Sequence, residues 1–350
     1  MKKIGILTGG GDCPGLNATI RAVVRKGMTE YNYEMCGILA GWKGMIEGNI
    51  EVFDMKNVSG ILNKGGTIIG TSRTNPFRED NNGDPERILG NIKKFDIHAI
   101  VVIGGEDTQG VAFKLSELGV NVVGIPKTID NDLPGTDYTF GFDTAVNIAV
   151  EAIDRIHTTA ESHNRVMVIE VMGRHTGWIA TFAGISGGAD VILIPEKQID
   201  MEDVYAIIKK RHKRGKNFSI VVVSEGIKLP VEDNEKGEHV LQSTKTDAFG
   251  HVMLGGVGSV LANMIEKGTG FESRCTVLGH TQRGGTPTAF DRILGTRFGI
   301  AAIDLIHKGE FGKIVVLKGN EIKSIELKEV MGRFKTVDDY WYDLAKVFFG

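Results

Sequence analysis

The chain has 350 residues, enough for one large or two medium-sized domains with real hydrophobic cores. Lys and Arg number 41 against 44 Asp and Glu, so the formal net charge is −3, which argues against a general nucleic-acid-binding protein. No segment approaches the length of a membrane span, and the N-terminus lacks a signal-peptide pattern. The chain has 3 cysteines, an odd number, and they lie far apart in the sequence. We therefore expect a cytoplasmic protein without a disulfide framework.

Short apolar runs that end in glycine or a polar turn recur along the chain and predict β-strands. The predicted strands are 4–7, 99–103, 122–125, 166–171, 191–194, 219–223 and 314–317. Helical periodicity lies between them, as in Leu16, Ile20 and Val23 and again in Phe142, Ala149 and Ile153. Because strands alternate with helices, we expect an α/β fold with mainly parallel sheets covered on both faces, in two units with crossing connections.

Two segments near the end of the chain are expected to stay outside the site. The polar stretch 232–238 predicts an exposed loop. The segment 328–350 is rich in aromatic residues, and we expect it to form a packing helix rather than part of a binding site.

The first predicted strand is followed by the run TGGGDCPG at 8–15 and then by a helix. Small residues at such a turn let backbone N–H groups approach phosphate oxygens, and the helix N-terminus favours an anion. The run matches neither GxGxxG nor the Walker pattern, so a tight strand-to-helix turn without a ligand is the alternative.

The strand at 99–103 is followed by GGEDTQG at 104–110, which opens another helix. Glu106 and Asp107 could simply cap that helix. Capping does not require two preceding glycines, whereas close approach of a ligand with a divalent cation does favour them. Further upstream, Arg73 is either a surface residue or a clamp for a phosphoryl group.

The strand at 122–125 is followed by PKTIDND at 126–132, which places two carboxylates, a hydroxyl and a lysine at one edge of a sheet. Ligands bind at that edge in open α/β sheets. A solvated turn is the alternative reading, because Asn131 and Asp132 are common turn residues.

Arg and His accompany glycine after two later strands, in MGRHTG at 172–177 and GHTQRGG at 279–285. Together with the acidic and glycine-rich turns upstream, this distribution fits recognition of a phosphorylated, hydroxyl-rich small molecule.

Taken together, the motifs resemble the phosphofructokinase family over nearly the whole chain. The motifs are GGDCPGLN at 10–17, GGEDT at 104–108, TIDND at 128–132, MGR at 172–174, SEG at 224–226 and GHTQRGG at 279–285. The resemblance implies two Rossmann-like three-layer α/β domains with the active site in the cleft between them. It further implies a glycolytic phosphotransferase that uses Mg²⁺ and phosphorylates the 1-hydroxyl of fructose 6-phosphate.

The resemblance also implies a division of the chain and a set of roles. Residues 1–140 plus 253–305 would bind the phosphoryl donor, and 141–252 plus 306–350 would bind fructose 6-phosphate. Asp130 matches the catalytic base, Thr128 would position the transferring group, and Arg174 would stabilise its charge.

Glu106 and Asp132 correspond to the metal-side carboxylates. Glu106 stands where many family members have Asp, which leaves its coordination geometry open. The donor would contact Gly11, Arg73, Asp107, Thr108 and Lys127. Fructose 6-phosphate would contact Thr128, Asp130, Met172, Gly173, Arg174, Glu225, His280 and Arg283. Arg165 and Arg274 match arginines that reach the sugar phosphate of a neighbouring subunit, so a homodimer or homotetramer is expected.

Asp107 and Lys127 bear on the choice of donor, because members of the family that use ATP commonly have Gly at both positions. Asp107 would bring bulk and negative charge towards the α-phosphate of a nucleotide, and Lys127 would fill the vacated space. The combination resembles the pyrophosphate-dependent members of the mixed-substrate branch. Pyrophosphate is therefore the expected donor, with ATP as the alternative.

Two other classes of function are less well supported by the residues. A nicotinamide-dependent oxidoreductase would need the GxGxxG fingerprint and a ribose-binding acid, which the chain lacks. A non-catalytic phosphate-binding regulator would be expected to have lost Asp130 or the basic residues, and both are present.

Overall fold

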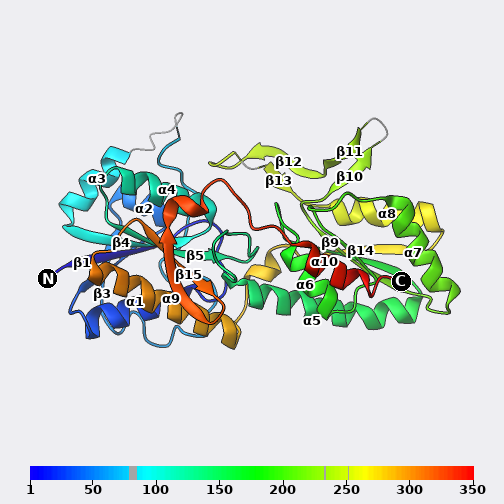
Figure 1. The fold of residues 1–350 in the computed structure, drawn as a ribbon, viewed down its shortest axis with the longest axis horizontal. Helices are drawn as coiled ribbons and strands as arrows, with labels where there is room; N and C mark the ends of the chain where they lie inside the picture. Colours follow the sequence, from blue (N-terminus) through cyan, green and yellow to red (C-terminus); the bar gives the residue numbers. More distant parts are fainter. Residues whose placement is uncertain (79–84, 232–233, 251) are drawn as a thin grey trace.

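A computed structural model describes residues 1–78, 85–231, 234–250 and 252–350. Two α/β units lie side by side, with the N-terminus in the first and the C-terminus in the second (Figure 1). Each unit has a mainly parallel sheet with helices on both faces, so the expected fold class is confirmed. None of the described helices is long and apolar enough to cross a bilayer.

The first unit is built on an eight-stranded sheet, within the described residues, in the order β16-β15-β5-β4-β1-β2-β3, with β6 beside β5. Its strands are β1 (Lys3–Thr8), β2 (Glu34–Ile38), β3 (Ile50–Phe53), β4 (Ile97–Gly104), β5 (Val122–Thr128), β6 (Phe140–Gly141), β15 (Lys313–Lys318) and β16 (Glu321–Glu326). Only β3 and β16, at the two edges, pair antiparallel among these strands.

Helices cover both faces of this sheet because its strands are apolar on both sides. Ile4 and Ile6 belong to the core under α1 and α9, whereas Leu7 belongs to the core under α2, α3 and α4. The helices of this unit are α1 (Leu16–Thr29), α2 (Gly41–Glu47), α3 (Pro85–Lys94), α4 (Glu106–Glu117), α9 (Ala289–Lys308) and the 3₁₀ turn η2 (Leu327–Val330).

The second unit has a four-stranded parallel sheet in the order β14-β7-β9-β8. Its strands are β7 (Val166–Val171), β8 (Val191–Leu193), β9 (Ser219–Ser224) and β14 (Ser273–Val277). Val166 and Val168 pack under α7 and α8, and Met167 and Ile169 pack under α5 and α6. The helices are α5 (Phe142–His163), α6 (Trp178–Ser186), α7 (Met201–Lys213), α8 (Val257–Thr269) and α10 (Asp339–Lys346), with the 3₁₀ turn η1 (Gly279–Arg283) after β14.

Helix α5 joins the two units, since it begins directly after β6 and ends directly before β7 (Figure 1). One apolar cluster runs along it from the first sheet to the second. The start of α5 is held by Asp291 of α9, whose carboxylate accepts the backbone N–H of Thr144 at 2.8 Å and its hydroxyl at 2.5 Å. The units are therefore joined by a shared core as well as by the chain.

The strands predicted from apolar runs are all present, but the expected boundaries between the units are wrong at two places. β14 lies in the second sheet, although 253–305 was assigned to the first unit. β15 and β16 lie in the first sheet, although 306–350 was assigned to the second. The assignment fails because strand pairing is decided by contacts between segments distant in the sequence. The chain crosses between the units as often as expected, but the second and third crossings follow β14 and β16 instead of preceding β14 and β15.

The prediction of a loop at 232–238 is wrong for residues 234–238, which belong to a strand. The chain forms two antiparallel pairs in this region, β10 (Lys228–Val231) with β11 (Asn234–His239), and then β12 (Leu241–Thr246) with β13 (Val252–Leu254). Residues 232 and 233 of the predicted loop lie outside the described part of the chain. These hairpins lie along one side of both units in Figure 1.

Candidate active site

The loops after the parallel strands of both sheets meet around one cavity of about 240 Å³. The first unit contributes the loops after β1, β4 and β5, and the second contributes those after β7, β9 and β14. The cavity is lined by Gly10, Gly11, Asp12, Arg73, Gly105, Glu106, Asp107, Thr108, Lys127, Thr128, Ile129, Asp130, Asp132, Met172, Arg174, His175, Glu225, Asp247, Phe249, Leu254, His280, Arg283 and Phe334. The site therefore lies at the carboxyl ends of the strands, as open α/β sheets predict.

Lys127 is almost completely buried, with 3% of its side chain exposed. Its ammonium group donates to the carbonyl oxygen of Gly9 at 2.9 Å and to that of Gly11. Burial lowers its pKa, because removal from water disfavours the charged form. The lysine thus holds a positive charge directly against the glycine-rich loop.

Glycine is required at two places by side chains that pack against this loop. A Cβ on Gly9 would lie 2.5 Å from Cγ2 of Thr108, a residue of α4 whose side chain packs against the glycine-rich loop. A Cβ on Gly11 would lie 2.8 Å from Nη1 of Arg283, so the guanidinium of the second unit packs on the backbone of the first. Gly9 thus leaves room for a side chain of its own unit, and Gly11 lets the second unit pack closely on the first.

Asp130 lies at the centre of the cavity wall, and its Oδ1 is buried without a hydrogen-bond partner among the described residues. Its backbone N–H donates to Oγ1 of Thr128 at 3.0 Å. Burial raises the pKa of the carboxyl, and Arg283 and Arg174 oppose that rise. A buried carboxylate oxygen with a vacant lone pair, close to two guanidinium groups, is suited to accept a proton from a bound hydroxyl.

Asp132 and Glu225 extend this carboxyl cluster. Burial, together with repulsion from Asp130, raises the pKa of each to about 7. Glu106 adds a further negative charge that raises the pKa of Asp132. The acidic groups thus gather in one place, where water is too scarce to screen their charges.

A divalent cation would fit beside Glu106 and Asp132. Among the described residues no three Asp, Glu, His or Cys side chains form a metal cage. Mg²⁺ is usually held by one or two carboxylates together with phosphate oxygens and waters. The donor set of two carboxylates, and their mutual repulsion, therefore suit Mg²⁺ that arrives with a phosphate.

The loop after β7 carries Arg174 and is held by hydrogen bonds to neighbouring residues of the second unit. Gly173 adopts φ 136°, which favours glycine, and its carbonyl accepts the hydroxyl of Ser224 at 2.6 Å. The backbone N–H of Met172 donates to Oε1 of Gln282 at 3.3 Å. Thr176 bonds across to the other unit, where its hydroxyl donates to the carbonyl of Asp130 at 3.4 Å.

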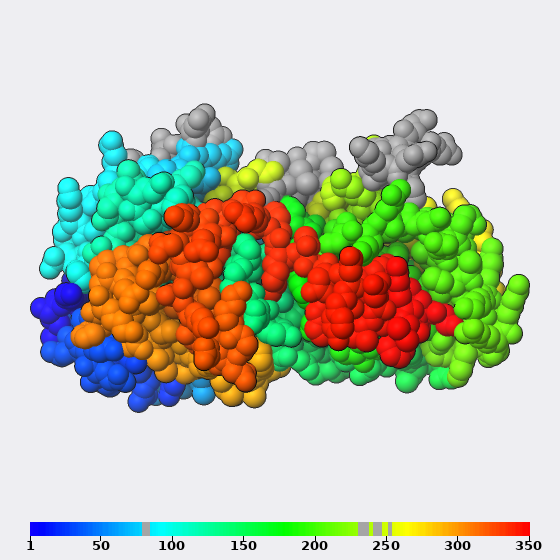
Figure 2. All heavy atoms as spheres, viewed as in Figure 1, coloured from blue at the N-terminus to red at the C-terminus, as the bar shows by residue number. Residues whose placement is uncertain are grey.

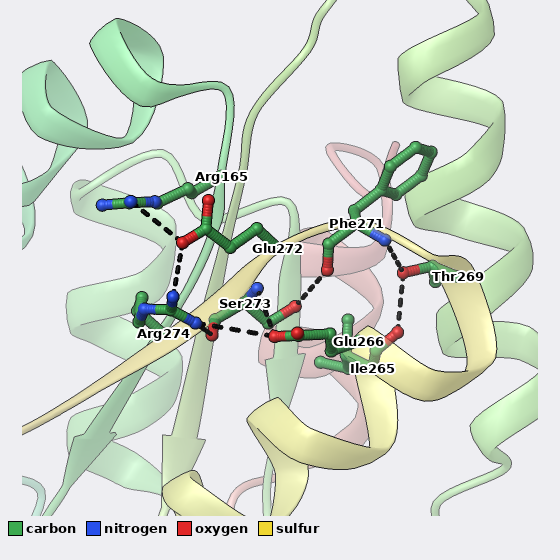
Figure 3. A network of polar contacts seen from close by, with 8 residues as sticks. All are labelled: Arg165, Ile265, Glu266, Thr269, Phe271, Glu272, Ser273 and Arg274. Atoms are coloured by element: carbon green, nitrogen blue, oxygen red, sulfur yellow. Dashed lines mark hydrogen bonds and ion pairs between the residues drawn. The ribbon is translucent and has the colours of Figure 1, made fainter.

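The structure brings together almost all residues that the motifs marked as a site. Gly173 lies beneath the cavity rather than in its lining, between Met172 and Arg174. Arg165 and Arg274 lie elsewhere, where both pair with Glu272, Arg165 at 2.9 Å (Figure 3). They flank the amino ends of β7 and β14, and a strand of six residues spans about 20 Å. They therefore face away from their own chain's cavity.

Most of the chain is similar to a known protein family. The family model for phosphofructokinase matches residues 3–306. The chain belongs to the phosphofructokinase family.

A pyrophosphate--fructose 6-phosphate 1-phosphotransferase of Streptomyces coelicolor is 56% identical over 349 residues, covering 99% of this chain and 100% of the relative. An ATP-dependent 6-phosphofructokinase 3 of the same organism is 46% identical over 344 residues, covering 98% and 99%. The structure of phosphofructokinase from Saccharomyces cerevisiae matches with a TM-score of 0.81 and 30% identity, over 94% of this chain and 45% of that one.

Some cavity residues of this phosphofructokinase were not predicted from its sequence. Asp247 follows β12 and forms an ion pair with Arg73, with the two atoms Oδ2 and Nη1 3.1 Å apart. Phe334 comes from the segment expected to be a packing helix, and its ring stacks on His175. His175 could have been found, since it directly follows the MGR motif. Nothing in the sequence linked Asp247 or Phe334 to the site.

The pH dependence of stability is expected to change in Glu225→Gln. A carboxyl whose pKa rises on folding stabilises the fold below its ordinary pKa, and that contribution is lost as the pH rises through about 7. Glutamine keeps the shape but cannot ionise. The variant should therefore have a larger free energy of unfolding than wild type at pH 8, with a smaller difference at pH 5, measured by urea unfolding in buffer free of Mg²⁺ and phosphate.

The matched control is Glu117→Gln, at an exposed position of α4. It should leave the free energy of unfolding within about 0.5 kcal/mol of wild type at both pH values. An equal effect of Glu225→Gln at pH 5 and pH 8 would contradict the assignment of a raised pKa.

Proposed function

We propose that this phosphofructokinase transfers a phosphoryl group reversibly from pyrophosphate to the 1-hydroxyl of fructose 6-phosphate in glycolysis, with Mg²⁺. The observation that carries the proposal is the placement of Lys127 and Asp107 in the wall of one cavity, beside the glycine-rich loop. Full-length relatives at 56% and 54% identity that carry the name pyrophosphate--fructose 6-phosphate 1-phosphotransferase support it. A reducing cytoplasm fits the three cysteines, which are unpaired in the described structure.

The choice of pyrophosphate as donor follows from the space and the charge that Lys127 and Asp107 bring to the cavity. Lys127 occupies the floor below Gly10, because a Cβ on Gly10 would lie 3.7 Å from its Nζ. Asp107 stands in the first turn of α4, where a nucleotide would extend past its terminal phosphates. A carboxylate there repels an α-phosphate, whereas pyrophosphate ends before it and gains the positive charge of Lys127.

The chemistry assigned to the residues is general base catalysis with electrostatic stabilisation. Asp130 accepts the proton of the 1-hydroxyl at its unpartnered Oδ1. Arg174 and Arg283, which already compensate Asp130, bring positive charge to the phosphate oxygens. Thr128 is held by the backbone N–H of Asp130 and lines the same wall, where it orients the transferring group.

Glu106 and Asp132 would hold Mg²⁺. When bound, the ion supplies charge neutralisation to the phosphate oxygens of the donor. Met172, Glu225 and His280 line the sugar-phosphate side of the cavity and would bind the hydroxyls of the substrate.

ATP is the second candidate donor. A relative of nearly the same length, 46% identical, is named an ATP-dependent 6-phosphofructokinase, so overall similarity alone does not separate the two donors. Residues in the donor half of the cavity therefore decide the question, and an experiment on Asp107 addresses it directly.

A homodimer or homotetramer belongs to the proposal, with Arg165 and Arg274 directed at the sugar phosphate of a neighbouring subunit. Their support is their position at the amino ends of β7 and β14, away from their own cavity. The solution mass should be two or four times the 38.0 kDa of the chain, measured by light scattering. A monomer that is fully active at the same concentration would refute the shared site.

Asp130→Ser should abolish turnover while substrate binding is retained. Loss of a general base costs about 10²–10⁴-fold in kcat, and Asp130 provides the proton acceptor in the cavity wall. Fructose 6-phosphate binding, measured by calorimetry, should stay within about tenfold because the arginines remain. Activity close to that of wild type would exclude Asp130 as the base and return the site to a binding role.

Asp107→Gly should improve the use of ATP relative to pyrophosphate. Removing the carboxylate removes repulsion and bulk, so the ratio of kcat/KM for ATP to that for pyrophosphate should rise by about tenfold or more, equivalent to about 1.4 kcal/mol. Asp107→Asn is the matched variant that keeps the bulk and removes the charge. Wild type with equal or higher kcat/KM for ATP would overturn the choice of donor.

A further inference from the structure

The segment between η2 and α10 crosses from the first unit to the second at the edge of the cavity (Figure 1). We call residues 332–337 the strap. In the space-filling view the end of the chain continues over the surface from one unit to the other (Figure 2). Phe334 of the strap lines the cavity, whereas α10 beyond it packs on α6, with the rings of Trp341 and Phe182 4.7 Å apart, and pairs with Lys197 through Asp339.

The strap binds the loops of the first unit that carry the carboxylates. The backbone N–H of Gly332 donates to Oε1 of Glu106 at 3.3 Å, and the backbone N–H of Lys335 donates to the carbonyl of Asp132 at 2.7 Å. The ammonium group of Lys335 donates to the carbonyls of Thr136 and Asp137, at 3.1 and 2.8 Å. Lys335 therefore ties both ends of the loop that follows Asp130.

The strap also binds the loop of the second unit that carries Arg174. The ring of Phe334 stacks on that of His175, with centroids 4.3 Å apart and planes inclined by 19°. The indole N–H of Trp178 donates to the carbonyl of Lys335 at 2.6 Å. Farther along, the backbone N–H of Val337 donates to Glu196, which also accepts the N–H of Gly177.

Direct bonding between these two loops is weak in the described part of the chain. The Thr176 hydroxyl donates to the carbonyl of Asp130 at the long distance of 3.4 Å. Lys335 contacts both sides, through its N–H and ammonium on one and its carbonyl on the other. The strap thus bridges the loop of Asp130 and the segment that follows Arg174.

We propose that the strap is a positioning element of the active site, in which Lys335 and Phe334 hold the loop of Asp130 in register with the loop of Arg174. Its kinetic consequence rests on the phosphoryl transfer proposed above. Phosphoryl transfer depends on orientation, and a misplacement of 1 Å can cost about 10²-fold in rate. The strap acts through the two loops and leaves the reacting atoms to Asp130 and Arg174.

The kinetic test uses Lys335→Met and Phe334→Ala in the full chain. Each should lower kcat by roughly 10- to 100-fold, since alignment is lost. Each should leave KM for fructose 6-phosphate and for pyrophosphate within about threefold, because every side chain that binds them is retained. Lys328→Met, at an exposed lysine of η2, and Phe348→Ala, at an exposed phenylalanine after α10, are the matched controls and should retain wild-type kcat.

Amide hydrogen exchange provides a second readout that does not depend on activity. In both variants the loops 128–137 and 172–178 should exchange faster together, while the sheets of the two units keep wild-type exchange. Should Lys335→Met fail to fold, Trp178→Phe removes the indole donor to the strap while keeping an aromatic ring, and should show the same pattern. Wild type that is inactive with either donor would refute the proposed function, and the exchange experiment would still decide the role of the strap.

Wild-type kcat together with wild-type exchange in the variants would overturn the proposal. So would a fall in kcat accompanied by faster exchange throughout both units, since that pattern describes general destabilisation. Faster exchange confined to one of the two loops would also contradict it, because the strap is proposed to hold both.

Discussion

Burial of opposite charges in the cleft between the two units is the constraint on which the rest of the structure depends. Asp130, Asp132 and Glu225 have raised pKa values chiefly because burial removes them from water. An uncompensated buried charge is strongly destabilising. Arg174 and Arg283 lower the cost by facing Asp130. The carboxyl ends of the two sheets must therefore meet, and the helices and connections serve that arrangement.

The connections between the units explain how the meeting is maintained. Helix α5 carries a continuous apolar cluster from one sheet to the other and sets their coarse arrangement. Arg283 packs on Gly11, and the strap bonds to loops on both sides, so the finer register is set by polar contacts around the cavity. Apolar packing is tolerant of small shifts, whereas hydrogen bonds and ion pairs are directional. The first kind of contact builds the cleft, and the second aligns the reacting groups.

The proposed donor preference rests on two residues of the cavity. Lys127 lies near the end of β5 and Asp107 in the first turn of α4, yet both line the cavity. Lys127 places its ammonium group against the glycine-rich loop, and Asp107 places a carboxylate at the start of α4. Relatives with nearly the same length and names that specify different donors are consistent with selection by a few charges on a common scaffold.

The sequence by itself determined most of the buried strands, the helices α1 and α5 and the motif residues, because these depend on local periodicity and on side-chain chemistry. Lys127, Asp130 and Arg174 were identified in this way. The edge strands β14 and β16 were not predicted, since almost all of their residues are exposed or half-buried and their apolar pattern is weak. Only the tertiary structure decided which strand joins which sheet and brought Asp247 and Phe334 to the cavity. These depend on contacts between distant segments, and no local pattern records which distant partner a segment will meet.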